Sequence, residues 1–259
     1  MDAVTCLRVD GVTKSFGGVT AVDDVSFAMH EGVVHAIIGP NGAGKTTLLN
    51  LLSGVYRPTR GHIVFDSREL THAPTHAFGA AGIARTFQTP QMFGNMSVVE
   101  NVMTGRHRLL RSGVWQTLVH APSLARAERE GRRKAQSLLR LLGLADKADA
   151  APSALSFGAQ KRLEIARALA SEPALLLLDE PAAGLNATEA REIERVIRVL
   201  ADRGMAVVLV EHDMRLVMDV SDRILVLHDG RCLCEGSADT VRNDARVIEA
   251  YLGAADEHA

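Results

Sequence analysis

The sequence predicts an α/β fold that combines a mainly parallel sheet, an N-terminal antiparallel β part and an inserted helical part. Three observations predict it. Short apolar runs at 33–38, 175–178 and 206–210 alternate with helical patterns, as parallel strands and their crossover helices do. Glycine turns divide the first thirty residues into short β-like runs. Between 73 and 144, glycine and proline break the strand pattern and helical segments dominate.

The N-terminal β-like runs, such as 7–9 and 25–28, are separated by turns like Gly17-Gly18, which indicates an antiparallel sheet. Phe16 lies in the glycine-flanked loop before that turn, and aromatic residues make up only 4% of the chain. It is therefore a candidate platform on which a purine base stacks. Packing of Phe16 into the core is an equally open interpretation.

A phosphate-binding loop follows the first buried strand. The run 33–38 is too short and too β-branched for a helix, while 48–53 reads as a short helix with Gly54 as its C-cap. A strand, a glycine-rich turn and a helix N-terminus together point backbone N–H groups and the positive end of the helix dipole at one spot. The residues of this predicted polyphosphate cradle are Gly39, Pro40, Asn41, Gly42, Ala43, Gly44, Lys45, Thr46 and Thr47.

Within this loop, the G-x-x-x-x-G-K-[ST] pattern predicts that Lys45 reaches the β- and γ-phosphates and that the Thr46 hydroxyl completes a Mg²⁺ shell. A carboxylate pair, Asp179 and Glu180, follows the apolar run 175–178. Because ligands of α/β folds bind at the carboxyl ends of strands, we expect Asp179 in the metal shell. Glu180 is the candidate general base that faces the attacking water. A solvated acidic turn is the alternative.

The inserted part contains two predicted helices. Ser97 and Glu100 form a capping box that opens the first, and the second covers 124–142 and ends at Gly143. The stretch between them, 106–122, has no clear period. It is either a loop that contacts a partner or a packed insertion. After residue 174 the pattern predicts, in addition to the strands above, a helix, a hairpin and a helical tail at 186–203, 222–236 and 247–252.

Composition excludes several classes of protein. The chain has 259 residues of which 47% are hydrophobic, so it can bury a large core, and its net charge of −2 offers no basic surface for nucleic acid. No apolar stretch approaches the ~20 residues that span a bilayer, and no signal-peptide order opens the chain. We therefore expect a cytosolic protein that reaches a membrane only through a partner. The cysteines Cys6, Cys232 and Cys234 fit a reducing compartment, as strand residues rather than metal ligands.

The segment 155–169 starts with a serine and a glycine break and continues as a helix. Such a helix N-terminus can bind a second phosphate group, although an ordinary capped helix is an open alternative. The γ-phosphate pocket of one chain has little obvious need for two such helix N-termini.

The order of the phosphate loop, Gln88, 155–159, Asp179-Glu180 and His212 resembles the ATP-binding-cassette (ABC) ATPases over residues 4–253. The resemblance implies ATP and Mg²⁺ as ligands. It also implies that two cassettes pair head to tail, so that Ser156 and Gly158 of one chain close the site of the other. Gln88 would contact Mg²⁺ and the attacking water and couple the site to a membrane partner, and His212 would touch the γ-phosphate.

The chain departs from the family pattern at two positions. The usual signature Leu-Ser-Gly-Gly-Gln has Ala159 in place of its glutamine, which the resemblance links to weaker contacts across the pair. Asn186 stands where the loop after the acidic pair usually has Asp, which would alter communication between the paired sites. The whole chain, 1–259, is expected to be one ABC ATPase domain. Its predicted parts are a nucleotide core at 1–72 and 174–236, a helical subdomain at about 73–173 and a tail at 237–259.

Several runs resemble the branched-chain amino-acid importers within this family: 82–88, 182–186, 211–214 and 248–253, with a similar insertion at 106–133. The implied function is the ATPase subunit of an importer, peripheral to the cytoplasmic face of the inner membrane. Its implied partners are a second ATPase subunit, identical or a sister, two transmembrane permease subunits and, indirectly, a solute-binding protein. The alternatives are an exporter of lipid or lipopolysaccharide and a soluble ABC ATPase of translation or DNA repair.

Overall fold

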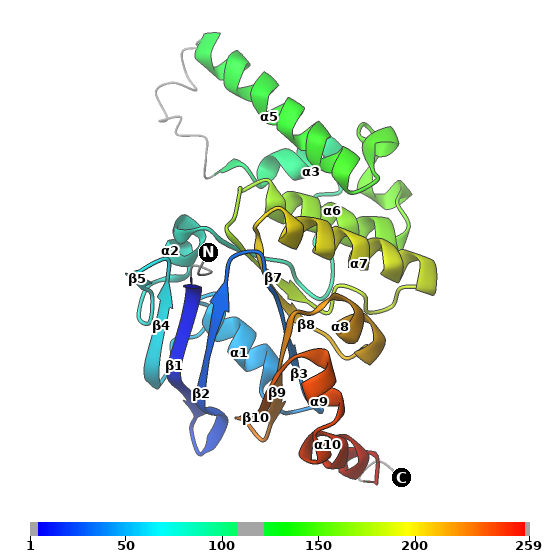
Figure 1. Cartoon of the computed structure of the whole chain (residues 1–259). Coiled ribbons are helices and arrows are strands. Elements are labelled where there is room, and N and C mark those ends of the chain that lie inside the picture. Colours follow the sequence, from blue (N-terminus) through cyan, green and yellow to red (C-terminus); the bar gives the residue numbers. More distant parts are fainter. Residues whose placement is uncertain (1–4, 108–121, 257–259) are drawn as a thin grey trace.

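The computed structural model describes residues 5–107 and 122–256 and contains two sheets (Figure 1). The first is antiparallel, with the order β2-β1-β4-β5, and the second has the order β10-β9-β3-β8-β7-β6. Strands of the first sheet are β1 (Thr5–Phe16), β2 (Val19–His30), β4 (Arg60–Phe65) and β5 (Arg68–Glu69). Strands of the second are β3 (Val34–Ile38), β6 (Ile83–Arg85), β7 (Leu175–Asp179), β8 (Ala206–Val210), β9 (Arg223–His228) and β10 (Arg231–Gly236).

The predicted helices are present, and three short helices that were not predicted, α2, α8 and α9, accompany them. The α-helices are α1 (Lys45–Leu52), α2 (Thr75–Ala81), α3 (Val98–Thr104), α5 (Pro122–Leu141), α6 (Phe157–Leu169), α7 (Ala187–Asp202), α8 (Met214–Val220), α9 (Ala238–Arg242) and α10 (Ala245–Asp256). Short 3₁₀ turns cover Ala145–Lys147 and Pro152–Ala154. The predicted capping box opens α3, and Gly143, with a φ of +67°, lies just past the end of α5. Helix α1 starts three residues before the predicted 48, because Gly44 in the left-handed region lets Lys45 open its first turn.

The mainly parallel sheet predicted from the apolar runs is confirmed. Strand β3 pairs in parallel with β8 and β9, and β7 pairs in parallel with β8 and β6, while β10 closes the edge as an antiparallel hairpin with β9. Strand β6 lies inside the predicted helical part and still joins this sheet through β7. That pairing places Arg85 opposite Leu177, two residues before Asp179 on β7.

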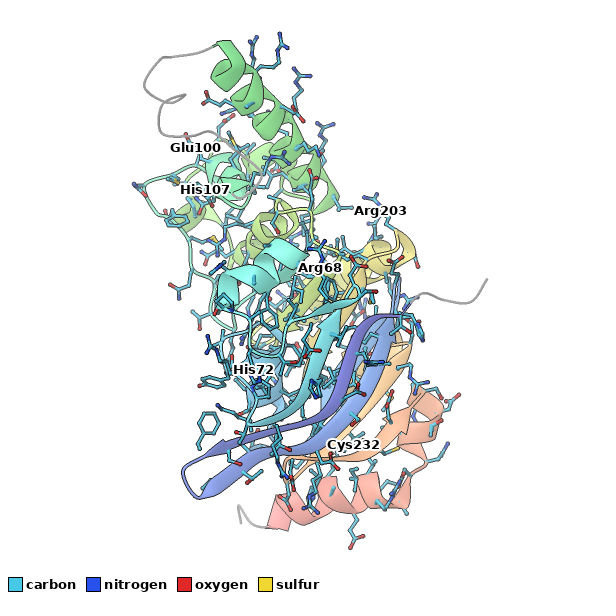
Figure 2. The ribbon with its side chains drawn as sticks, turned by 90° about the vertical axis from the view of Figure 1, so that its left-hand side faces the viewer. Arg68, His72, Glu100, His107, Arg203 and Cys232 are labelled. Carbon is cyan, nitrogen blue, oxygen red and sulfur yellow. The ribbon has the colours of Figure 1, made fainter. Side chains whose placement is uncertain are left out.

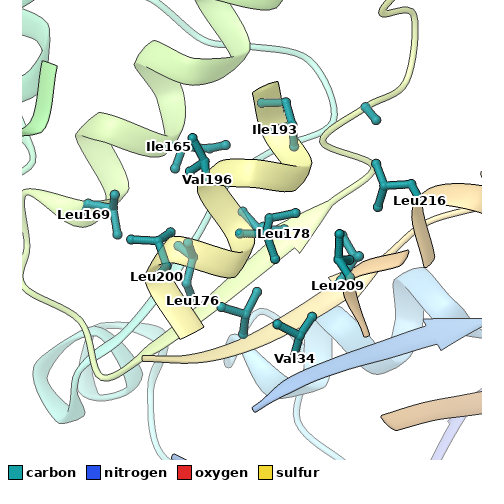
Figure 3. Close-up of a cluster of buried hydrophobic side chains, with 14 of the residues drawn as sticks. Val34, Ile165, Leu169, Leu176, Leu178, Ile193, Val196, Leu200, Leu209 and Leu216 are labelled. Atoms are coloured by element: carbon teal, nitrogen blue, oxygen red, sulfur yellow. The ribbon is translucent and has the colours of Figure 1, made fainter. Parts of the chain in front are cut away.

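Successive residues of the parallel strands face two separate cores. Ile37, Leu177 and Val208 face the core shared with α1 and the antiparallel sheet, whereas Leu176 and Leu209 face the other. Figure 3 shows this second core, in which side chains of α6 and α7 cover one face of the sheet. Helices α1 and α6 therefore cover opposite faces of the same sheet, as expected for strands buried on both sides.

We expect Leu176→Ala to lower the free energy of unfolding by about 2–5 kcal/mol, because Leu176 is fully buried between the sheet and the α6–α7 layer. Urea denaturation of both proteins measures the difference. Val19→Ala is the matched control, since Val19 is 68% exposed. Equal unfolding midpoints for Leu176→Ala and the wild type would contradict the assignment of this core.

The helical part extends beyond the sheets. In Figure 2, Glu100 and His107 lie in this part, while Arg68 and His72 lie by the antiparallel sheet. No helix in the described residues is long and apolar enough to cross a membrane. Most of the stretch 106–122, interpreted either as a partner-contacting loop or as a packed insertion, lies outside the described residues.

The cysteines lie on strands, as predicted. Cys6 and Cys234 are buried and Cys232 is exposed, and all three are unpaired thiols. Within 5–107 and 122–256, no group of three or more histidine, cysteine or acidic side chains could hold a metal ion. Cys232 and Cys234 both lie on β10.

Candidate functional site

The predicted phosphate loop connects β3 to α1 and is pressed against neighbouring backbone on two sides. A Cβ atom on Gly39 would lie 2.2 Å from the Leu227 carbonyl oxygen, and one on Gly44 would lie 2.3 Å from that of Ala21. Gly44 also has a φ of +98°. Only glycine fits such positions. Close backbone contact with β2 and β9 therefore fixes the conformation of the loop.

Lys45 lies inside this curl. Its Nζ donates hydrogen bonds to the carbonyl oxygens of Gly39 at 2.7 Å and Pro40 at 2.9 Å. Burial lowers the pKa of Lys45, and the nearby Glu180 carboxylate opposes that shift. The Thr46 hydroxyl is exposed on the first turn of α1, whose leading N–H groups have no partner within the helix. An ammonium, a hydroxyl and a helix N-terminus therefore converge on the surface that the sequence assigned to phosphate.

The acidic pair lies at the end of β7. Asp179 is buried, at 7% exposure, and Glu180 turns into the left-handed region with a φ of +45°. The Glu180 N–H donates to the Val210 carbonyl oxygen at 2.9 Å, which ties this turn to the end of β8. A non-glycine residue in that conformation is strained, and the surrounding structure has to hold it there.

Gln88 and His212 meet at Glu180. The Gln88 Nε2 donates to one Glu180 carboxylate oxygen at 2.6 Å, and the His212 Nδ1 lies 3.9 Å from the other. His212 is largely exposed, whereas its neighbour Glu211 is buried and accepts the His212 N–H at 3.0 Å. Gln88 and His212, which come from two separate loops, thus both lie beside the Glu180 carboxylate.

Sequence reasoning missed Lys161, which supports this cluster from α6. Its buried Nζ donates to the carbonyl oxygens of Gln88 at 2.5 Å and Glu180 at 3.1 Å. Burial lowers the pKa of this ammonium, while surrounding carboxylates, first among them Glu164, act in the opposite direction. The available signal was the position of Lys161 on the apolar face of a helix. A lysine that is buried there needs a partner, because buried lysines are almost always paired.

Arg85 was also missed. Its Nη2 donates to the Asp179 Oδ2 at 2.8 Å, and both side chains are nearly buried. Only the pairing of β6 with β7 brings the two together, so no local pattern in the sequence could reveal the contact.

The candidate signature motif caps α6. The Ser156 Oγ accepts the Ala159 N–H at 3.3 Å and donates to the Glu189 Oε1 at 3.1 Å. A Cβ on Gly158 would lie 2.6 Å from the Glu189 carboxyl group. Asn186, one of the two departures from the family pattern, is the N-cap of α7 and shares a capping box with Glu189. Asparagine is among the best N-cap residues, so this departure preserves the helix start.

The chain brings one group of predicted site residues together and leaves another apart. Gln88 and His212 both lie beside Glu180, and the Glu180 charge acts on Lys45. Among the described residues, no hydrogen bond or ion pair joins Ser156 or Gly158 to the phosphate loop. The reason is topological, since α1 and α6 cover opposite faces of the sheet.

Phe16 lies at the surface rather than in a core. It is 43% exposed, its ring meets Tyr56 edge to face at 5.2 Å between centroids, and the Lys14 Nζ lies 5.0 Å from the ring centre. Core packing, one of the two interpretations of this residue, is thus wrong. Stacking on a purine stays a prediction.

The oxygen donors near the loop fit Mg²⁺. Thr46 has a hydroxyl and Asp179 a carboxylate. The Gln88 amide nitrogen donates to Glu180, so its amide oxygen is the atom that could face a cation. Mg²⁺ prefers one or two carboxylates together with phosphate oxygens and water rather than a cage of protein ligands. The residues present therefore suit a metal that arrives with a nucleotide.

Comparison with known proteins identifies the family. The family description "ABC transporter" matches residues 22–183. This chain belongs to that family. The cassette is 42% identical over 250 residues to the high-affinity branched-chain amino acid transport ATP-binding protein LivG of Salmonella typhimurium. The matched region covers 96% of this chain and 98% of LivG. The BraF protein of Pseudomonas aeruginosa, with the same description, is 42% identical over the same shares of the two chains.

A second family description, "Branched-chain amino acid ATP-binding cassette transporter", matches residues 231–257 of the cassette. The lipopolysaccharide export protein LptB of Acidithiobacillus ferridurans is also related, at 37% identity over 95% of this chain and 96% of LptB.

Solved structures show the same fold. A nucleotide-free ATP-binding cassette from an ABC transporter superposes with a TM-score of 0.83 at 32% identity, over 96% of this chain and 99% of that one. A dimeric cassette bound to ADP and phosphate in a post-hydrolysis state superposes with a TM-score of 0.75 at 27% identity, over 90% and 98%. The predicted fold is confirmed, and the protein is an ABC ATPase.

Proposed function

We propose that this cassette is the ATPase subunit of an importer for branched-chain amino acids or related small solutes. The observation that carries the proposal is the match of 231–257 to the branched-chain subgroup, together with 42% identity to LivG along nearly the whole chain. The matched segment corresponds to β10, α9 and α10. In this proposal, the protein works at the cytoplasmic face of the inner membrane as a peripheral subunit.

In the proposed site, the triphosphate of ATP lies on the loop 39–47, with Lys45 on the β- and γ-phosphates and Phe16 under the base. Thr46, Asp179 and Gln88 hold Mg²⁺, which supplies charge neutralisation at the phosphates when bound. Glu180 accepts a proton from the attacking water, and Gln88 orients that carboxylate. His212 donates a hydrogen bond to the γ-phosphate.

The proposed partner in catalysis is a second cassette. Ser156 is exposed at the start of α6, and the buried Gly158 follows it in the first turn. This helix start cannot serve the loop of its own chain, because the sheet separates α6 from α1. A copy or sister subunit placed head to tail would bring that helix start to the open side of the phosphate loop. ATP binding would then close the pair and hydrolysis would reopen it.

The proposed contact with two permease subunits is a groove of about 520 Å³ beside the Gln88 loop. Phe87 and Phe93 are 52% and 48% exposed there, and Arg167 lies at its edge. Large apolar side chains that remain exposed beside a catalytic loop suit a protein partner. The nucleotide core at 1–72 and 174–236, the helical subdomain at 73–173 and the tail remain our proposed division of the chain.

The test is solute-stimulated ATP hydrolysis by the cassette, co-expressed with a candidate permease pair and solute-binding protein and reconstituted in liposomes. We expect leucine, isoleucine or valine to raise the rate several-fold, with amides, urea and aromatic acids as the competing panel. Stimulation by lipopolysaccharide alone would replace the importer with an exporter. Co-purification with ribosomes or DNA instead of permeases would favour a soluble ABC ATPase.

A further inference from the structure

Arg85 stands at the end of β6 and makes contacts that the site roles above do not use. Its side chain is only 11% exposed. The Nη2 donates to the Asp179 Oδ2 at 2.8 Å, and the Nη1 donates to the Asn50 Oδ1 at 2.6 Å and to the Ser53 Oγ at 3.0 Å. One guanidinium therefore joins the acidic end of β7 to the last turn of α1.

This bridge connects α1 and β7, which carry two of the three proposed metal ligands, Thr46 and Asp179. Helix α1 starts with Lys45 and Thr46, and Arg85 holds its other end through Asn50. On β7, Arg85 occupies Oδ2 of Asp179, which leaves Oδ1 as the carboxylate oxygen for a cation. A planar guanidinium can make both contacts at once because its donors form a rigid fork.

The arrangement is not explained by charge alone. A guanidinium beside the Asp179 carboxylate repels a second cation, so its charge by itself would weaken metal binding. What the side chain contributes is orientation.

We propose that Arg85 is a positioning residue that fixes the Asp179 carboxylate relative to α1, so that Asp179 and Thr46 are ready for Mg²⁺. This inference rests on the proposed assignment of Asp179 as a metal ligand. Residues that orient a metal ligand typically change metal affinity by about 10–100-fold when they are replaced.

Arg85→Lys tests the proposal because it keeps the positive charge and removes the fork. The measurement is titration of the full-length protein, saturated with ADP, with Mn²⁺ followed by electron paramagnetic resonance. We expect Mn²⁺ to bind about 10–100-fold more weakly, while ADP affinity in EDTA stays close to wild type. Arg132→Lys, which alters an exposed ion pair with Asp149, is the matched control and should change none of these.

Asn50→Ala is the second variant, since it cuts the bridge at α1 and leaves the ion pair in place. We expect weaker Mn²⁺ binding in the same direction. Wild-type Mn²⁺ affinity in Arg85→Lys overturns the proposal, and if that variant does not fold, wild-type affinity in Asn50→Ala does so. Asp179→Asn separates the two hypotheses: if it binds Mn²⁺ normally, the metal assignment itself is wrong.

Discussion

Glu180→Gln should bind ATP with near wild-type affinity and hydrolyse it about 10²–10⁴ times more slowly, the range for loss of a positioned general base. Glutamine has the shape of glutamate, and its carbonyl oxygen can still accept the hydrogen bond that Gln88 donates at 2.6 Å. The left-handed backbone at residue 180 is equally open to both side chains. Only the basicity and the negative charge are lost, so the chemical step is affected while the phosphate loop is not.

The measurement pairs a binding titration with a fluorescent ATP analogue and a steady-state assay of phosphate release by the assembled complex. Glu249→Gln is the control, because it makes the same chemical change on the exposed side of α10. A Glu180→Gln complex that hydrolyses ATP at the wild-type rate would remove Glu180 from the catalytic role. A variant that no longer binds nucleotide would show instead that the carboxylate supports the loop.

The fold could be predicted because its elements are strongly patterned. The buried strands β3, β7 and β8 are short apolar runs, and α7 shows its buried face in the spacing of Ile193, Val196 and Leu200. Strand β6 was not predicted, since three residues within a helical segment carry too little pattern. Its place in the sheet comes from pairing with β7, a contact between segments about ninety residues apart.

The site residues, too, could be predicted where a local motif contains them and not where distant segments bring them together. Residues in motifs, such as Lys45 and Glu180, could be located because each motif places backbone and side chain together in a short stretch. Arg85 and Lys161 belong to no such pattern, and their partners come from distant strands and loops. Burial of a charged side chain is decided by tertiary packing, so the second layer of the site required the structure.

Lys45→Ala should weaken ATP binding by roughly 10–100-fold, which corresponds to losing one charged hydrogen bond of about 1.5–3 kcal/mol. The Lys45 Nζ lies in the curl of the loop on the carbonyl oxygens of Gly39 and Pro40. Phosphate oxygens can replace these acceptors and bring a full negative charge to a partly buried ammonium, which strengthens the contact.

This variant should fail at a different step from Glu180→Gln. Loss of Lys45 acts on the dissociation constant of the nucleotide, whereas loss of the Glu180 charge acts on turnover of nucleotide already bound. The same fluorescent titration measures the dissociation constant of Lys45→Ala. Lys147→Ala is the control, since Lys147 is exposed in the helical part and forms an ion pair with the exposed Asp146. Unchanged affinity in Lys45→Ala would mean that backbone N–H groups and the helix N-terminus bind the phosphates without the ammonium. Equal loss of ATP binding in Lys45→Ala and Glu180→Gln would show that the two charges act together on the nucleotide. The Glu180 carboxylate does act on the pKa of Lys45, so this outcome is the alternative to separate roles.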